Sequence, residues 1–247
     1  MAGLLHNEEG TMKSVLVTGG SRGIGLAIVD RFKTAGWRVA ACARALDRLA
    51  DSPADFTFSC DVADVAAVRD GIAAVMREFG AIDALVNSAG LAGSNPLDAD
   101  SDDDLWHRII DVNLNGTYYF TKYAFPHIPD GGRIINIGSV LSHTGVADQT
   151  AYSAAKHAVL GFTRAFAHHA ATRGVTVNAV CPGWVRTDMA RGRWQELHID
   201  EKKAASGVPL GRVVEPAEVA SLVHFLASDE AGAITGQAFN IDGGTLA

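Results

Sequence analysis

Cysteine is scarce in this chain of 247 residues, and its three copies are scattered. Cys42, Cys60 and Cys181 are odd in number and form no CxxC pair, which argues against a disulfide framework and a cysteine-based metal centre. Each lies in an apolar run, which favours a buried free thiol. The sequence therefore predicts a cytoplasmic protein from a reducing compartment, with no metal site.

Long apolar runs and long basic runs are absent as well. No apolar stretch approaches the roughly 18 residues that a membrane-spanning helix needs, so we expect no membrane partner. The formal net charge is −7 and lysine and arginine form no long run, which argues against a nucleic-acid partner. Residues 1–12 lack the basic start and apolar core of a signal peptide, and we predict a flexible N-terminal tail there.

The chain does contain enough apolar residues for one sizeable core. Hydrophobic residues make up 48% of it, and no repeat or linker divides the sequence. Short apolar runs that end in glycine, asparagine or aspartate alternate with helical patterns. We expect strands at residues 14–18, 38–43, 57–60, 82–86, 133–137, 175–181 and 237–241, and helices at 23–35, 64–79, 105–125, 215–227 and from before 152 to about 172.

This alternation of apolar strands with long helices is typical of a parallel sheet that is covered on both faces. We therefore predict an α/β protein with a seven-stranded parallel sheet, folded as one doubly wound Rossmann domain over residues 13–247. Residues 187–206 are charged and irregular in pattern, and they stand apart from the alternation.

A glycine-rich turn joins the first predicted strand to the first helix. Its sequence, Thr18-Gly-Gly-Ser-Arg-Gly-Ile-Gly25, contains a GxxxGxG pattern. Glycines allow the backbone to turn tightly and to approach a pyrophosphate, while the helix N-terminus supplies N–H groups and the positive end of its dipole. Glycine also marks ordinary tight turns, but the position between a first strand and a helix predicts dinucleotide binding.

Tyr152 and Lys156 lie four residues apart in a predicted helix and therefore share one face. A free phenol has a pKa of about 10 and exchanges protons poorly at neutral pH. A nearby ammonium favours the phenolate, so we expect Lys156 to lower the pKa of Tyr152 and the pair to act as an acid/base catalyst. The same spacing occurs by chance on many helices, and the neighbouring motifs must decide between these interpretations.

Six motifs in order favour catalysis. They are TGxxxGxG from Thr18, NxAG at residues 87–90, Asn113, Ser139 thirteen residues before Tyr152, YxxxK at Tyr152 and Lys156, and Pro182-Gly183. In this order and spacing the chain resembles the short-chain dehydrogenase/reductase family from about residue 14 to residue 244. The stretch 152–189 is most similar to ketoreductases of polyketide and fatty-acid type. Ser88 replaces the usual asparagine of NxAG, and we expect only a local change of hydrogen bonding there.

The resemblance implies the catalytic roles. Tyr152 would be the general acid/base, and Lys156 would lower its pKa and hold the nicotinamide ribose. Ser139 would hydrogen-bond the substrate oxygen, and Asn113 would anchor a water in a proton relay. Hydride transfer to a ketone builds negative charge on oxygen, and two hydroxyl donors meet that need. The implied reaction interconverts a ketone and a secondary alcohol.

The resemblance also implies which residues bind the cofactor. They are Gly19, Ser21, Arg22, Gly23, Ile24, Gly25, Arg44, Asp61, Val62, Asn87, Ala89, Gly90, Tyr152, Lys156, Pro182, Gly183, Val185 and Thr187. Asp61 would bind the adenine amino group, and residues 87–90 would line the adenosine ribose and phosphates.

The choice of cofactor depends on the end of the second predicted strand. An acidic residue there would accept from the ribose 2′-OH and select NAD(H), but the sequence is Cys42-Ala-Arg44. Arg44 and Arg22 would clamp a 2′-phosphate, and we favour NADP(H) over NAD(H). The alternative is that both arginines are solvated or bind only the pyrophosphate.

The sequence indicates the substrate less clearly than the reaction. Candidate walls of its pocket are Ser139, Leu141, Gln149, Tyr152, Trp184 and Trp194. Residues 187–206 resemble the substrate lid of the family, and the basic side chains there would either meet an anionic substrate or form a solvated face. We expect a small-molecule ketone of β-ketoacyl or polyketide-like type and, from the resemblance, a homotetramer.

Two other functions stay open at this point. One is an NAD-dependent alcohol dehydrogenase of the same family, and the other is a non-catalytic dinucleotide-binding redox sensor. The presence of Tyr152 and Lys156 together argues against the sensor. An epimerase or dehydratase with a larger C-terminal substrate domain is disfavoured, because only about sixty residues follow Gly183.

Overall fold

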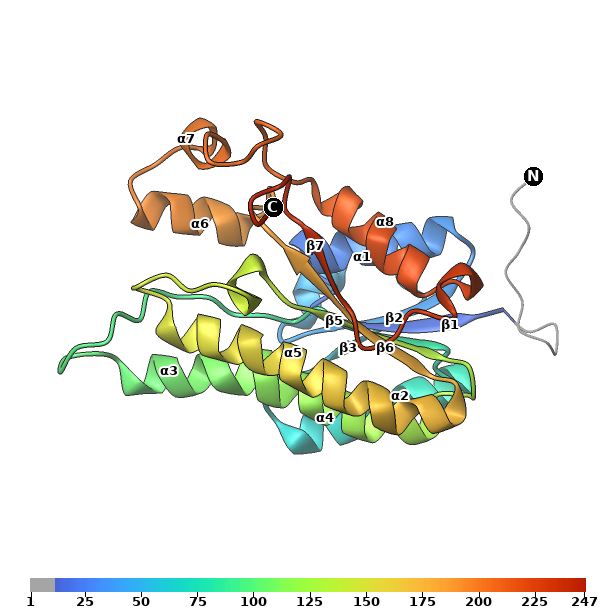
Figure 1. The fold of residues 1–247 in the computed structure, drawn as a ribbon. Coiled ribbons are helices and arrows are strands. Elements are labelled where there is room, and N and C mark those ends of the chain that lie inside the picture. Colours follow the sequence, from blue (N-terminus) through green and yellow to red (C-terminus); the bar gives the residue numbers. More distant parts are fainter. Residues whose placement is uncertain (1–11) are drawn as a thin grey trace.

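The computed structural model describes residues 12–247, so the predicted tail lies outside the described residues except for Met12. Within the described part, seven strands form one parallel sheet in the order β3-β2-β1-β4-β5-β6-β7 (Figure 1). The strands are β1 (Ser14–Thr18), β2 (Arg38–Ala43), β3 (Phe56–Ser59), β4 (Ala84–Asn87), β5 (Arg133–Ile137), β6 (Thr176–Pro182) and β7 (Ala238–Ile241). The predicted doubly wound α/β fold is confirmed. The limits of β1, β2 and β5 are as predicted, and those of the other four strands differ by one or two residues.

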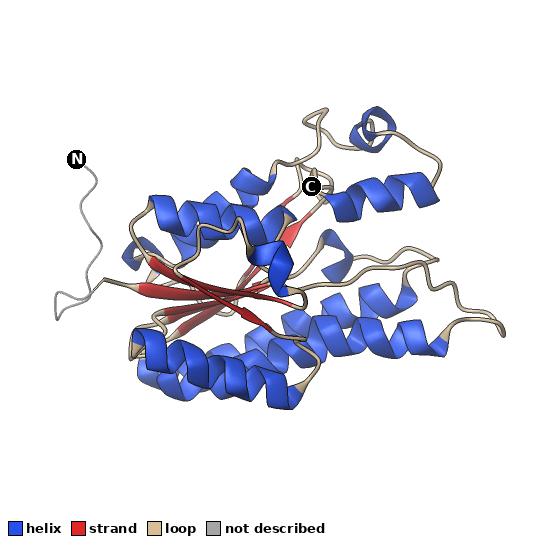
Figure 2. Ribbon diagram, turned by 180° about the vertical axis from the view of Figure 1, so that it is seen from behind, coloured by secondary structure: helices blue, strands red, loops and turns tan. Residues whose placement is uncertain are grey.

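Helices cover both faces of the sheet (Figure 2). One face carries α1 (Gly23–Thr34) and α8 (Pro216–Leu226), which pack against each other. The other face carries α2 (Val65–Phe79), α4 (Gly116–Ala124) and α5 (Thr150–Ala170), with α3 (Asp103–Ile110) packed on α5. Short 3-10 turns are η1 (Leu46–Leu49), η3 (Phe125–His127), η4 (Val140–Ser142), η5 (Ala171–Arg173) and η6 (Asp229–Ala231).

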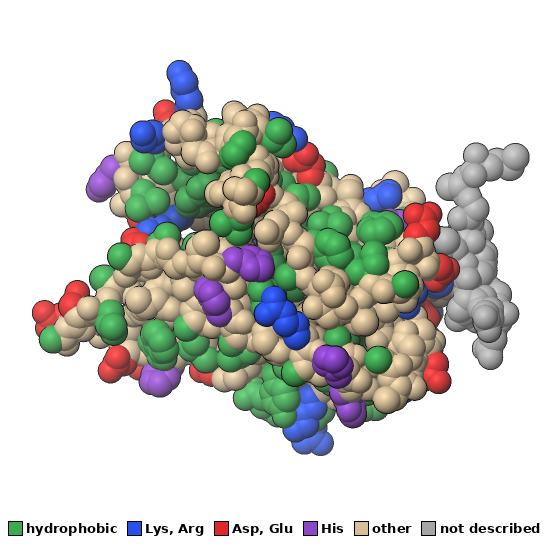
Figure 3. Space-filling view, in the orientation of Figure 1, with side chains coloured by type: hydrophobic (Ala, Val, Ile, Leu, Met, Phe, Trp, Pro, Cys, Tyr) green, Lys and Arg blue, Asp and Glu red, His purple; other side chains and the backbone are tan. Residues whose placement is uncertain are grey.

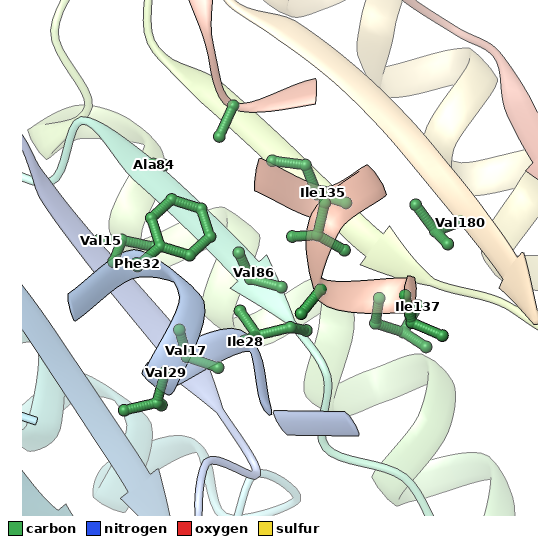
Figure 4. Packing of buried hydrophobic residues seen from close by; sticks show 14 of the residues in the cluster. Val15, Val17, Ile28, Val29, Phe32, Ala84, Val86, Ile135, Ile137 and Val180 are labelled. Atoms are coloured by element: carbon green, nitrogen blue, oxygen red, sulfur yellow. The ribbon is translucent and has the colours of Figure 1, made fainter. Parts of the chain in front are cut away.

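Alternate residues of the central strands face opposite helix layers. In β1, Val15 and Val17 pack into the cluster that includes Phe32 of α1 (Figure 4), whereas Leu16 packs into the cluster on the other face. A strand that is buried on both faces needs an apolar side chain at nearly every position. This requirement explains why the strands are continuous apolar runs in the sequence.

The helix predicted at residues 105–125 is not one regular helix. A π-helical turn, η2 (Asp111–Asn115), separates α3 from α4. Asn113 Nδ2 donates to the Ile109 carbonyl at 2.8 Å and so competes for the oxygen that its own backbone N–H would use in an α-helix. Turns of this kind are frequent at functional sites, and this one holds a predicted catalytic residue.

The segment at residues 187–206 was predicted to be irregular, and this prediction is wrong. It contains α6 (Asp188–Glu196) and α7 (Glu201–Ala205), which we call the lid helices. The Thr187 side chain accepts from the Ala190 N–H and the Asp200 side chain accepts from the Lys203 N–H, so each helix has an N-cap. A small apolar cluster ties the two helices together and is formed by Ala190, Trp194, Ala204, Ala205 and Val213.

The carboxyl ends of the strands point toward the end of the molecule where the lid helices lie (Figure 1). The chain reverses its direction of travel across the sheet between β1 and β4, because β2 and β3 lie on one side of β1 and β4 to β7 on the other. In open parallel sheets, ligands bind at the carboxyl ends of the strands beside such a point. Among the helices described in residues 12–247, none is long and apolar enough to cross a membrane.

Candidate active site

A cleft of about 600 Å³ opens at this end of the sheet, below lid helix α6. Figure 3 shows the surface hollowed between the lid lobe and the body. Residues that line the cleft include Gly19, Ser21, Arg22, Gly23, Ile24, Gly25, Cys42, Arg44, Arg48, Cys60, Asp61, Val62, Ala89, Gly90, Gln149, Thr187, Arg193 and Glu196. Most of the predicted cofactor-binding residues are thus brought together along one surface.

Gly19 and Gly25 of the glycine-rich turn have no room for a side chain. A Cβ on Gly25 would lie 2.1 Å from the Gly19 carbonyl oxygen, and a Cβ on Gly19 would lie 2.8 Å from Ala89 Cα. Gly19 also has a φ of +70°, in the left-handed region that favours glycine. The turn after β1 and the NxAG turn after β4 therefore touch backbone to backbone, and their contact forms the floor of the cleft.

The N-terminus of α1 opens into this cleft without a protein cap. Arg22 is the N-cap residue, its side chain makes no capping hydrogen bond, and the first turn contains no acidic residue. The N–H groups of such a turn need acceptors, and the helix dipole favours an anion there. A pyrophosphate supplies both acceptors and charge, so the turn fits a dinucleotide.

Three guanidinium groups line the same cleft. Arg22, Arg44 and Arg48 are exposed and line it, and in the described residues none of them pairs with a carboxylate. Arg48 was not predicted from the sequence, because it lies in η1 after β2 and belongs to none of the motifs. Unpaired arginines suit a phosphate group, and no acidic residue follows β2 to accept from a ribose hydroxyl.

Asp61 and Val62 also line the cleft, after β3. Arg108 Nη2 of α3 contacts Asp61 Oδ2 at 2.5 Å, and the Ala63 N–H donates to Asp61 Oδ1 at 3.0 Å. Partial burial acts to raise the pKa of Asp61, but these hydrogen bonds outweigh it and hold that pKa below its usual value. The carboxylate thus stays ionised and fixed, with Arg108 as a partner that the sequence did not reveal.

Asn87 is placed differently from its neighbours Ala89 and Gly90. Its Nδ2 donates to Thr121 Oγ1 at 3.1 Å and to Asn136 Oδ1 at 2.8 Å, inside the domain. Its side chain is buried and does not line the cleft, so the predicted contact with the adenosine ribose is not supported by its position. The side chain instead links β4 to β5 and α4, because the strand's alternation turns it inward.

Three of the predicted catalytic residues lie together beside the cleft, although none of them is among the residues that line it. Ser139 caps η4 after β5, Tyr152 lies in the first turn of α5, and Lys156 lies one turn further on. The Lys156 ammonium is 5.5 Å from the centroid of the Tyr152 ring and donates to the Ile137 carbonyl at 2.7 Å. A Cβ on the cleft residue Gly90 would lie 3.9 Å from Lys156 Nζ, which places the group directly beside the cleft.

The acidity of the pair differs from the sequence prediction. Burial raises the pKa of Tyr152 to about 12, although a hydrogen bond with Ser139 acts in the opposite direction. Burial also lowers the pKa of Lys156 to about 8. The prediction that Lys156 holds the pKa of Tyr152 below its ordinary value is therefore wrong for the protein alone, because desolvation of the phenol outweighs its hydrogen bond with Ser139.

Asn113 stands beside this group in the π-helical turn. Its Nδ2 donates to the Leu91 carbonyl at 2.7 Å as well as to Ile109, and the Leu91 N–H donates to its Oδ1 at 3.4 Å. A Cβ on Gly90 would lie 3.2 Å from the same Oδ1. Asn113 therefore fixes the segment after β4 against the catalytic residues.

The segment after β6 contributes unevenly to the cleft. Thr187 lines it, while Pro182 and Val185 are buried, and Val185 forms a bridge with Val214. Gly183 allows close packing, because a Cβ there would lie 2.9 Å from Asp242 Cβ. These residues fix the course of the chain toward the lid, and Thr187 is the one whose side chain can reach a ligand.

The predicted substrate walls are only partly found at the cleft. Gln149 lines it, whereas Ser139, Leu141 and Tyr152 are not among the residues that line it. Trp184 and Trp194 do not line it, because the Trp194 ring is buried in the lid's apolar cluster with its centroid 6.0 Å from that of Trp184. A large apolar ring stabilises the lid more when it is buried there than when it is exposed at the cleft.

Arg193 of α6 reaches across the cleft mouth. It contacts Asp148, just before α5, and it contacts Glu196 at 2.8 Å on its own helix. Its side chain is only 11% exposed, so it belongs to neither a solvated face nor a free anion site. The ion pair connects the lid to the segment that precedes Tyr152.

Comparison with known proteins agrees with this site. The family model described as enoyl-(acyl carrier protein) reductase matches residues 19–245. A 3-oxoacyl-[acyl-carrier-protein] reductase of Vibrio harveyi is 41% identical over 247 residues, which cover 96% of this chain and 98% of that protein. An acetoacetyl-CoA reductase of Shinella zoogloeoides is 41% identical over 235 residues, covering 93% and 96%.

A solved structure shows the same fold. A variant of actinorhodin polyketide ketoreductase with NADPH superimposes with a TM-score of 0.88 at 37% identity, over 98% of this chain and 99% of that one. Family profile, relatives and structure all extend over nearly the whole chain. This protein therefore belongs to the short-chain dehydrogenase/reductase family.

Proposed function

We propose that this protein is an NADP(H)-dependent oxidoreductase that interconverts a ketone and a secondary alcohol, with Tyr152 as acid/base. The observation that carries the proposal is the meeting of Ser139, Tyr152 and Lys156 beside a cleft that has an uncapped helix N-terminus and unpaired arginines. Such a cleft accepts a phosphorylated dinucleotide, and the three side chains beside it can handle a proton.

Ser139 and Tyr152 supply two hydroxyl groups to one point. A ketone oxygen at that point would gather negative charge during reduction, and two donors would stabilise it. The raised pKa of Tyr152 keeps the phenol protonated at neutral pH, so it is ready to donate its proton. The Lys156 ammonium, which is present below its pKa of about 8, favours the phenolate that remains after the transfer.

Different residues would bind different parts of the dinucleotide. The N-terminus of α1 and its glycine turn would hold the pyrophosphate, Arg22, Arg44 and Arg48 would hold a 2′-phosphate, and Asp61 would face the adenine. When bound, the nicotinamide supplies or accepts the hydride. The NADPH in the ketoreductase structure supports NADP(H), and the absence of an acid after β2 disfavours the NAD-dependent alternative.

The substrate we propose is a β-ketoacyl or polyketide-like ketone. The support comes from the relatives, which are named for the reduction of 3-oxoacyl and acetoacetyl groups. Residues 187–206 would act as the substrate lid, with Gln149 on the opposite wall. Trp184 and Trp194 are left out of this wall, because they belong to the lid core.

We also propose a cytoplasmic homotetramer. On α4, the ring of Tyr118 is 40% exposed and meets Phe162 of α5 edge to face at 6.2 Å. An aromatic surface of this kind suits burial against a second copy. The three free, buried thiols suit a reducing compartment. Light scattering after gel filtration tests the assembly, and a monomer at assay concentrations would contradict it.

The reaction is tested by a panel of β-ketoesters, acyl thioesters, cyclic ketones and aryl ketones, each assayed with NADPH and with NADH. We expect ketone-dependent oxidation of NADPH, with a lower kcat/KM for NADH. A clear preference for NADH would reject the cofactor assignment. NADPH binding without turnover of any ketone would favour the redox-sensor alternative.

A further inference from the structure

The hydroxyl of Ser139 is oriented by its own turn. The Leu141 N–H donates to Ser139 Oγ at 3.1 Å, so one acceptor position of this oxygen is already occupied. Ser139 is 8% exposed, and few other partners can reach its hydroxyl. The hydroxyl hydrogen is thereby left to point toward Tyr152 and the place of a ketone oxygen, where it is needed as a donor.

The position of Leu141 depends in turn on Ser142. Ser142 is the last residue of η4, and its side chain is 3% exposed. The Ser139 N–H donates to Ser142 Oγ at 3.1 Å, and the Ser142 N–H donates to the Ser139 carbonyl at 2.8 Å. Ser139 and Ser142 therefore form a reciprocal capping box around a single turn.

The Ser142 hydroxyl is held from behind by β6. A Cβ on Gly138 would lie 3.1 Å from Ser142 Oγ and 2.8 Å from Cys181 Sγ, so these two atoms are pressed against the Gly138 backbone. Cys181 is fully buried, and its thiol lies against the same stretch of backbone as Ser142 Oγ. The Gly138 N–H donates to the Val180 carbonyl at 2.7 Å, which fixes the start of the turn to the same strand.

We propose that Ser142 is a positioning residue for catalysis: its buried hydroxyl fixes the Ser139 backbone so that the Leu141 N–H orients the Ser139 hydroxyl toward the reacting oxygen. This inference rests on the proposed function. Without the Ser142 hydroxyl, the Ser139 N–H becomes a buried donor without its partner, and the turn loses one of its two closing hydrogen bonds.

Loss of the Ser142 hydroxyl would also change the pKa of Tyr152. Hydrogen bonding with Ser139 acts to lower the pKa of Tyr152 against its burial. A Ser139 hydroxyl that no longer points at the phenol cannot stabilise the phenolate. The pKa of Tyr152, as it shows in the pH dependence of kcat, then rises. A variant that only folded less well would not show this rise.

The test is Ser142→Ala, assayed for NADPH affinity, kcat, KM and the pH dependence of kcat. We expect kcat to fall about tenfold to a hundredfold, with the alkaline limb at higher pH and NADPH affinity unchanged. The matched control is Thr144→Ala. The Thr144 hydroxyl donates to the Val140 carbonyl at 3.4 Å but is exposed and makes no hydrogen bond with Ser139, so kcat and the pH profile of this variant should stay as in the wild type.

A second pair of variants keeps the test decisive if Ser142→Ala folds poorly. Ser142→Thr and Ser142→Val have nearly the same shape, and only threonine has a hydroxyl. We expect the threonine variant to exceed the valine variant in kcat about tenfold and to retain the wild-type pH limb. Equal kcat values and pH limbs in this pair, or in wild type and Ser142→Ala, would overturn the inference. Failure of the proposed function is distinct, because the wild type itself would then reduce no ketone.

Discussion

The Lys156 ammonium is bonded to the Ile137 carbonyl at 2.7 Å, and its distance to the Tyr152 ring centroid is 5.5 Å. The lysine is therefore anchored to the end of β5 and lies beside the phenol ring. This position leaves Nζ at the edge of the cleft, where the ribose of a bound dinucleotide would also need donors. The pair thus links proton transfer to cofactor binding in one element, the first two turns of α5.

Replacing Tyr152 by phenylalanine removes the proposed acid/base and keeps the ring. We expect kcat for ketone reduction to fall about a hundredfold to ten-thousandfold while the Kd for NADPH changes little. Tyr123→Phe is the control, because that ring lies on α4 away from the cleft. Turnover of Tyr152→Phe near the wild-type rate would reject the mechanism.

Lys156 should make stability depend on pH in a direction that can be checked. Its pKa is lowered to about 8 in the folded protein from an ordinary 10.5. Between these values the unfolded chain binds more protons, so the free energy of unfolding rises with pH. Below about pH 8 the folded lysine is charged and buried, and its destabilising effect is fully present.

Between about pH 7 and about pH 9.5, we expect the free energy of unfolding of the wild type to rise by about 2 kcal/mol relative to that of Lys156→Met. Urea unfolding at each pH measures this difference. Arg69→Met is the control. Because Arg69 is exposed, the difference in free energy of unfolding between the wild type and this variant should not change with pH. A constant difference between wild type and Lys156→Met would show that the lysine is not desolvated as the structure indicates.

The fold could be predicted because its determinants are local. Strands such as β1 are continuous apolar runs since both faces are covered, and Gly25 must be glycine because a Cβ would meet Gly19. The order and spacing of the motifs then indicated which loops meet at the carboxyl edge. The π-helical turn was missed because it depends on where the Asn113 side chain donates its hydrogen bonds, which hydrophobic periodicity does not show.

The electrostatics of the site could not be predicted in the same way. The pKa of Tyr152 is raised mainly by burial, and burial is set by the packing of the whole domain and not by the spacing between Tyr152 and Lys156 in the sequence. The contact of Arg193 with Asp148 joins residues 45 positions apart. Trp194 was predicted to contact the substrate, but it is buried in the apolar cluster of the lid helices. Its burial could not be predicted, because a single aromatic residue in a charged segment forms no apolar stripe.

Arg44 should decide between the two cofactors. We expect Arg44→Ala to weaken NADPH binding about tenfold to a hundredfold, because it removes a charge-assisted contact to the 2′-phosphate, and to leave NADH binding unchanged. Fluorescence titration with both cofactors measures the effect, and Arg69→Ala serves as a control outside the cleft. Equal weakening of NADH and NADPH would place Arg44 on the pyrophosphate instead.

The Arg193 and Asp148 pair should hold the lid to the body. We expect Asp148→Asn to speed hydrogen exchange in α6 while exchange in α8 stays the same, because the lid loses its charged contact across the cleft mouth. Glu196→Gln is the matched control, since it removes the other carboxylate on Arg193 but leaves the contact with the body. Equal exchange in α6 for both variants would mean that the pair does not restrain the lid.

The glycine turn gives a final test of how the cleft is built. A Cβ on Gly25 would lie 2.1 Å from the Gly19 carbonyl oxygen, so the backbone must shift where the pyrophosphate would bind. We expect Gly25→Ala to lose about 1–3 kcal/mol of stability and at least about tenfold in NADPH affinity. Gly207→Ala is the control, because a Cβ there meets nothing within 4 Å, and its Tm and NADPH affinity should match the wild type. Normal NADPH affinity in Gly25→Ala would show that the contact between the two turns does not shape the cofactor site.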